Sequence, residues 1–250
     1  MTHTFIGEQF RNEVQRSFSL TNLRKGRKPI EMTEFSVTRT DFKRINNFMV
    51  KLKHSLEVNL PDWIGHDIRE FINVCIQSAH ENGLPVRKRF VYLTVDTKPL
   101  SKGQTLRNPG WHLDGLQGSE IPFKQPACFE FIWSNKLPIQ YSNQGFEIDG
   151  LNFLNHNVFD SLGDQVYDES VEITKENHIY LINAYQMYRS TPAQADCSDN
   201  VFLRLHFSEL PITSKTMTLN DQITYPYPVH STKGTIPEGL VIWEPENTTP

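Results

Sequence analysis

The chain has 250 residues, of which 38% are hydrophobic and 11% aromatic, enough for a sizeable core and too many for a disordered chain. Its 25 basic and 29 acidic residues give a net charge of -4, which argues against a protein dedicated to nucleic acid without ruling one out as a partner. The three cysteines are widely spaced and form no Cys-x-x-Cys pair, so neither a disulfide framework nor a structural zinc site is expected.

The length fits one large domain, and we expect a single domain over residues 1–250. The sequence does not open with an apolar segment followed by a small-residue cleavage site, and it contains no run of about 18 apolar residues. Free thiols fit a reducing compartment. We therefore expect a cytoplasmic protein with no membrane partner.

The first third of the chain predicts an arm followed by helices over residues 40–83. Residues 1–30 are polar and without a clear period, and we expect a poorly ordered arm or an edge strand there. A helix is expected to begin near Thr40, which can cap it, and to carry its apolar side chains on one face up to Leu52. A second helix is expected between a cap at Asp62 and the stop at Gly83, with one apolar face.

From Arg89 onward, short β-branched and aromatic segments alternate with turn residues, a pattern typical of strands. The expected strands cover residues 89–97, 127–134, 145–153, 170–175, 178–185 and 200–208. Helices followed by a run of strands predict a mainly β fold, a double-stranded β-helix or jelly-roll barrel over 89–208, with the N-terminal helices packed on one outer face. The Pro-rich residues 209–250 are expected to wrap the barrel irregularly or to cover its mouth.

The most informative segment is NPGWHLDGLQG, residues 108–118. His112 and Asp114 are two residues apart, so on an extended strand both side chains point to the same face. An imidazole and a carboxylate presented together can hold a divalent metal, and a third ligand from elsewhere would complete a facial triad suited to non-haem iron. An ordinary hydrogen-bonded pair fits the same short spacing.

The second informative segment, residues 180–208, contains YRSTPA followed by FLRLHFS. The order of HLD, YRSTPA and FLRLHFS along residues 90–208 resembles the iron(II)/2-oxoglutarate-dependent oxygenases. In that family a His-x-Asp on an early barrel strand binds iron, a later short step carries a distal histidine, and an arginine on the next strand holds the far carboxylate of 2-oxoglutarate.

The resemblance implies that His112 and Asp114 hold iron(II), that Tyr188 stands at the third ligand position, and that Arg204 pairs with 2-oxoglutarate. Tyr188 departs from the family, because a neutral tyrosine must lose a proton with a pKa near about 10 before it binds iron well. Three outcomes stay open. Tyr188 is an atypical ligand, or the metal takes His206 or only two protein ligands plus water, or the site has lost its metal and binds something without oxidising it.

His206 follows Arg204 by two residues, so both are expected to face the barrel interior. Together they would form a cationic pair suited to an anionic ligand, although a core histidine beside a structural arginine fits the spacing as well. Tyr92 and Thr94 are candidates to line the same pocket from the strand before the motif.

The leading functional hypothesis is therefore a non-haem iron(II)/2-oxoglutarate-dependent dioxygenase that hydroxylates a small-molecule or unidentified substrate. The first alternative is a jelly-roll that has lost catalysis and binds an anionic ligand or a partner. The second is a cupin-like metal isomerase or hydrolase, which shares the barrel and needs no 2-oxoglutarate. Fold alone does not separate these hypotheses, because one barrel hosts many functions.

Overall fold

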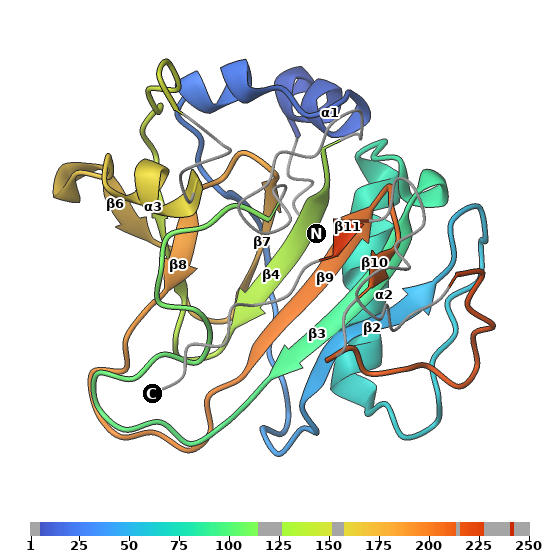
Figure 1. Ribbon diagram of the computed structural model, residues 1–250. Helices are drawn as coiled ribbons and strands as arrows, with labels where there is room; N and C mark the ends of the chain where they lie inside the picture. The colour runs from blue at the N-terminus through green and yellow to red at the C-terminus, as the bar shows by residue number, and fades with distance from the viewer. Residues whose placement is uncertain (1–5, 115–126, 152–157, 214–215, 228–240, 243–250) are drawn as a thin grey trace.

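The structure, a computed structural model, describes residues 6–114, 127–151, 158–213, 216–227 and 241–242. Most of its strands belong to two antiparallel sheets (Figure 1). The large sheet contains β1 (Ile30–Glu34), β2 (Ile45–Lys51), β3 (Phe90–Asp96), β4 (Phe129–Ser134), β7 (His178–Asn183) and β9 (Phe202–Ser208). The small sheet contains β5 (Ile139–Ser142), β6 (Val171–Ile173) and β8 (Tyr188–Ser190), while β10 (Ile212–Thr213) and β11 (Val241–Ile242) form a separate parallel pair.

From β3 onward the chain passes back and forth between the two sheets. The strand order is β1-β7-β4-β9-β3-β2 in the large sheet and β6-β5-β8 in the small one. His112 joins the small sheet through an isolated antiparallel bridge to Tyr188 of β8. The chain therefore visits the large sheet at β3, β4, β7 and β9, and the small sheet between these visits. This alternation is that of a double-stranded β-helix, and the predicted fold class is confirmed.

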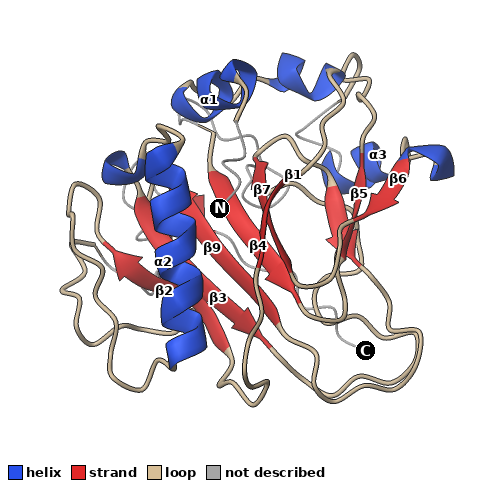
Figure 2. Ribbon diagram, turned by 180° about the vertical axis from the view of Figure 1, so that it is seen from behind, coloured by secondary structure: helices blue, strands red, loops and turns tan. Residues whose placement is uncertain are grey.

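The main apolar core lies on the outer face of the large sheet. Phe129 and Phe131 of β4 and Phe207 of β9 are fully buried there in one cluster with the apolar side of α2 (His66–Glu81). Side chains alternate between the two faces of a strand, so the residues between these phenylalanines point to the other side. Figure 2 shows α2 lying across the large sheet. The helix predicted for residues 62–83, and its place on one face of the barrel, are thus confirmed.

Residues 40–52 contain a strand, β2, where a helix was expected. Phe48 and Val50 pack into the cluster under α2, whereas Met49 packs into a different cluster on the opposite face. Because both faces of this strand are buried, apolar residues stand at odd and even positions, and their spacing imitates a helical period. Asn47, which has a positive φ of 44°, and two register shifts against β3 also interrupt the alternation.

The expectation of an arm or edge strand over residues 1–30 is wrong for the described part of that segment. A helix, α1 (Glu8–Gln15), and a 3₁₀ turn, η1 (Leu20–Arg24), occupy it, and the edge strand β1 begins only at its end. Asp62 does not cap α2 either. The helix begins after Gly65 and has no side-chain cap.

The strands predicted near β3, β4, β6, β7 and β9 are confirmed, whereas the one predicted over residues 145–153 is not observed in its described part, 145–151. The Glu147 carboxylate accepts hydrogen bonds from the backbone N–H groups of Ile148 and Asp149, and this local turn replaces a strand ladder. A short helix, α3 (Val158–Gly163), follows where no helix was expected.

The described part of the C-terminal segment runs along the edge strand β2. The backbone of Thr218 donates to the Asn46 carbonyl at 2.8 Å, and the Asn220 amide donates to the Met49 carbonyl at 2.8 Å. These bonds cover an edge that would otherwise expose unpaired backbone groups. Residues 228–240 and 243–250, which belong to the expected wrap, lie outside the described residues. Within the described chain, no helix is both long and apolar enough to cross a membrane.

Candidate functional site

Polar side chains gather on the inner face of the large sheet, opposite the phenylalanine core. The register places Arg204 of β9 between Thr94 and Ile132, and it places His206 between Tyr92 and Glu130. Arg204 and His206 are each only 6% exposed. Alternation along one strand thus brings two titratable groups into the interior, as their spacing predicts.

His112 and Tyr188 meet across the small sheet. Their backbones exchange two hydrogen bonds, 3.0 and 3.1 Å long, and their ring centroids are 4.3 Å apart. The Nδ1 atom of His112 lies 2.9 Å from the Gly110 carbonyl oxygen. A carbonyl can only accept, so Nδ1 carries the proton and Nε2 keeps a lone pair. Burial lowers the pKa of His112 and thereby favours this neutral form.

Asp114 is the next contact of Tyr188. The Tyr188 hydroxyl donates to Oδ2 of Asp114, and Nη1 of Arg204 donates to the same oxygen at 3.0 Å. Burial pushes the pKa of Asp114 upward, but the Arg204 charge and nearby hydrogen bonding outweigh it and hold that pKa well below its usual range. Asp114 is therefore ionised, and its charge is already compensated by a buried guanidinium.

Glu130 belongs to this cluster, although it stands in no motif of the sequence. Its side chain is 1% exposed, and Oε2 lies 3.0 Å from Nδ1 of His206 and 3.7 Å from Nη1 of Arg204. Its Oε1 lies 3.4 Å from the Tyr188 hydroxyl oxygen. Burial and the charge of Asp114 raise the pKa of Glu130 well above its usual range. One acidic residue among the large apolar side chains of the segment FEFIW is the signal that could have indicated it.

The expected cationic pair of Arg204 and His206 carries only one charge. Burial, followed by the nearby Arg204 charge, lowers the pKa of His206 to about 3, so the imidazole is neutral near pH 7. His206 is bonded to Glu130, and Arg204 also donates to the side-chain oxygens of Asn47 at 3.1 Å and Thr94 at 3.4 Å. Asn47, which stands in no motif of the sequence, reaches the cluster from β2.

Tyr92 shares the inner face but is bonded elsewhere. Its hydroxyl lies 2.9 Å from that of Tyr227 and accepts from the Ile212 backbone at 2.9 Å. The ring packs with Met49 and Phe90 in an apolar cluster. The structure therefore brings together His112, Asp114, Tyr188, Arg204 and His206, and it leaves Tyr92 beside them in a separate contact.

The donor set fits a metal with two protein ligands better than one with three. Among the described residues, no three His, Cys, Asp or Glu side chains converge as a metal site. His112 offers a lone pair on Nε2, and Asp114 offers a carboxylate. Burial, Asp114 and Glu130 together raise the pKa of Tyr188 well above its usual range, so its phenol stays protonated and donates instead of coordinating. His206 is already bonded to Glu130.

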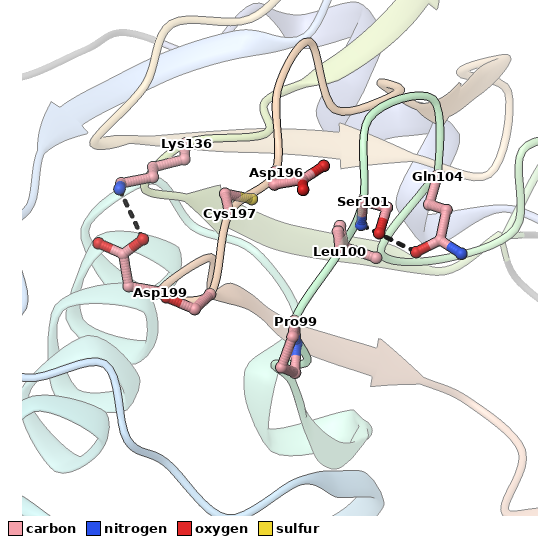
Figure 3. Close-up of a pocket in the computed structure, with 9 residues that line it drawn as sticks. Pro99, Leu100, Ser101, Gln104, Lys136, Asp196, Cys197 and Asp199 are labelled. Atoms are coloured by element: carbon pink, nitrogen blue, oxygen red, sulfur yellow. Dashed lines mark hydrogen bonds and ion pairs between the residues drawn. The ribbon is translucent and has the colours of Figure 1, made fainter.

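A separate cavity of about 460 Å³ lies between the loop after β3 and the loop before β9 (Figure 3). Leu100, Ser101, Gln104 and Cys197 are among the residues that line it, together with the ion pair of Lys136 and Asp199 at 2.6 Å. None of its lining residues belongs to the cluster around Asp114.

Comparisons with known proteins find only solved structures of low similarity. No family model and no curated protein matches the chain. ThoJ in a nickel complex, described as a non-haem monooxygenase, matches with 11% identity over 58% of this chain and 54% of that chain, at a TM-score of 0.34. EvdO2 from Micromonospora carbonacea var. aurantiaca, complexed with 2-oxoglutarate, matches with 10% identity over 81% of this chain and 91% of that chain, at a TM-score of 0.41. The chain thus spans about half of ThoJ, and similarity this low carries no conclusion on function.

Proposed function

We propose that this chain is a non-haem iron(II)- and 2-oxoglutarate-dependent oxygenase that hydroxylates a small-molecule substrate. One observation carries the proposal, a continuous chain of contacts in the barrel interior. His112 pairs with Tyr188, the Tyr188 hydroxyl donates to Asp114, and Asp114 accepts from Arg204. These residues come from three distant segments, so their convergence supports a common site.

In this proposal Nε2 of His112 and the Asp114 carboxylate hold iron(II), and the remaining coordination positions stay open to small molecules. The metal, when bound, supplies the oxidising chemistry together with 2-oxoglutarate and dioxygen. The other residues orient the two donors. The Gly110 carbonyl fixes the tautomer of His112, Arg204 keeps Asp114 ionised, and Tyr188 contacts both ligand side chains.

Anaerobic titration of the metal-free protein with iron(II) and then 2-oxoglutarate tests the proposal. We expect the visible charge-transfer band of the chelate in the native protein and its loss in His112→Ala. His178→Ala is a matched control, because Nδ1 of His178 also lies 2.8 Å from a backbone carbonyl two residues earlier, while its partner is Glu31 of β1. Absence of both the band and iron uptake in the native protein would overturn the proposal.

A second candidate, a barrel that binds a ligand without oxidising it, is favoured by the two donors on one carboxylate oxygen. Tyr188 and Arg204 already compensate the charge of Asp114 without a metal. Under this candidate the native protein does not consume 2-oxoglutarate, and Tyr188→His creates that activity by supplying a third nitrogen ligand. Consumption of 2-oxoglutarate by the native protein would dismiss it.

A further inference from the structure

The two arginines near the candidate site differ in how their charge is compensated. Arg204 lies 3.0 Å from Asp114 and 3.7 Å from Glu130, and it donates to two further side-chain oxygens. A guanidinium with this many partners has little charge left to offer a ligand, whether or not Glu130 is protonated. The second arginine is Arg107, which precedes the His112 motif in the chain.

Arg107 lies on the same inner face, next to Arg204. Its guanidinium carbon is 4.6 Å from the ring centroid of Phe202, and Nη1 is 3.2 Å from Oδ2 of Asp96. Asp96 and Phe202 face each other across β3 and β9, and both stand two residues from the Thr94 and Arg204 pair. Two residues along a strand correspond to about 7 Å, so the two arginines occupy adjacent rows of one sheet face.

The contacts of Arg107 leave positive charge uncompensated. Asp96 is its ion-pair partner but is shared with Arg44, whose Nε lies 3.0 Å from the other oxygen. Nη1 of Arg107 is buried and, like Nε of Arg204, makes no hydrogen bond within the described part of the chain, so the two arginines differ in the charges around them and not in this respect. A buried donor without a hydrogen bond is rare in folded proteins and marks a place where a ligand oxygen would fit. The Phe202 ring packs against one face of the Arg107 guanidinium, which leaves the edge of the guanidinium available to a carboxylate.

We propose that Arg107, rather than Arg204, binds the carboxylate of a small acidic ligand beside the Asp114 cluster. The ligand class is a short dicarboxylate, and for 2-oxoglutarate itself the assignment rests on the proposed function. The charge of Arg107 also acts on three groups of the candidate site. It lowers the pKa of the His112 imidazole, and it works against the raised pKa values of the Glu130 carboxyl and the Tyr188 phenol. A ligand held by Arg107 would therefore lie within electrostatic reach of the candidate metal ligands.

Isothermal titration of the metal-free protein with succinate and with 2-oxoglutarate tests this assignment. We expect Arg107→Met to weaken binding by about tenfold to a hundredfold, because one charge-assisted bidentate contact is lost. Arg44→Met is the matched control, since it removes the other partner of Asp96 and leaves Arg107 in place; it should change the dissociation constant by less than about twofold. Equal binding by native protein and Arg107→Met would overturn the assignment, as would native protein that binds neither acid.

Asp96→Asn separates ligand binding from a purely structural role of Arg107. It removes the carboxylate that competes for the guanidinium, so it should tighten succinate binding severalfold. A structural role predicts no tightening, and that result would also overturn the assignment. Failure of the oxygenase proposal is distinguishable, because iron(II) uptake and its loss in His112→Ala are measured without a dicarboxylate. Iron uptake with unchanged succinate binding in Arg107→Met would reject the assignment alone, and succinate binding without iron uptake would reject the oxygenase alone.

Discussion

The two faces of the large sheet bury side chains of opposite character on the same strands. On β9, Leu205 and Phe207 point toward α2 and are completely buried, whereas Arg204 and His206 point to the interior of the barrel and are almost as inaccessible. An apolar side chain gains from burial alone, but a polar one needs a partner for every buried atom. Burial therefore does not distinguish the core from the candidate site in this molecule. The hydrogen-bond partners do.

The largest effect on stability is expected on the outer face, from Phe207→Ala. Its ring stacks on Phe129 with centroids 4.5 Å apart and meets Phe131 edge-on at 5.9 Å. Removing the ring leaves a cavity between the sheet and α2, which should cost about 3–5 kcal/mol of unfolding free energy, measured by urea denaturation. Phe207→Leu, which keeps much of the volume, should cost less. A loss below about 1 kcal/mol for the alanine variant would show that this face is not the main core.

On the inner face, Arg204→Met should destabilise the protein by about 3 kcal/mol, since it leaves Asp114 and Glu130 buried without their shared cation. The distinguishing measurement is a double-mutant cycle with Asp114→Asn. The second substitution removes the stranded negative charge of Asp114, so the double variant should be more stable than the sum of the two single losses predicts, by more than about 1 kcal/mol. Simple additivity would mean that the two side chains do not depend on each other.

The same comparison explains how far sequence reasoning reaches into the fold. Helix α2 was predictable because only one of its faces is buried, which gives a clean helical period. Strand β2 was not, because Phe48 and Met49 are both buried on opposite faces and the usual alternation disappears. Short strands such as β8, with three residues, are set by their partners in the sheet and contain too few residues to show a period.

Within the candidate site, the sequence predicts the residues that stand in a short motif. It does not predict the residues that reach the site only because of how the strands pair. His112 and Asp114 share one motif, and Arg204 stands in the segment FLRLHFS that resembles the arginine-bearing strand of the oxygenases. Glu130 and Asn47 reach Arg204 only because β4 and β2 take particular places in the sheet. Pairing register over such distances is a property of the folded chain and is not encoded in local spacing.

Lys51 is a buried cation outside the candidate site, and it tests whether structural and ligand-binding polar groups differ in their hydrogen-bond partners. Lys51 is 2% exposed, and its ammonium donates to the backbone carbonyls of Leu52, Val86 and Arg89 at 3.0–3.1 Å. All three donors of the ammonium group are thus used, unlike those of Arg107. Lys51→Met should strand these carbonyls and cost about 2 kcal/mol in urea denaturation, with no change in succinate binding. A change in binding would show that partner count does not separate the two kinds of site.

The smallest effect is expected at β6, the half-exposed edge strand of the small sheet, where polar contacts replace burial. Lys28 lies 2.5 Å from Glu172 of β6, and the Tyr141 hydroxyl donates to the same carboxylate at 2.7 Å. These contacts, with Lys28 first, lower the pKa of Glu172 to about 2. Because the folded value lies below the unfolded one, the stabilisation is present above about pH 4.5 and is lost as the pH falls toward about 2.

Glu172→Gln should therefore lower the unfolding free energy at pH 7 by less than about 1 kcal/mol, since solvent screens this half-exposed pair, and the difference from native protein should shrink toward pH 3. Chemical denaturation at several pH values measures it, and Glu169→Gln controls for the loss of one nearby negative charge. A difference that grows as the pH falls would contradict the sign derived from the lowered pKa. It would mean that the Glu172 carboxylate is ionised less readily in the folded protein than in the unfolded chain.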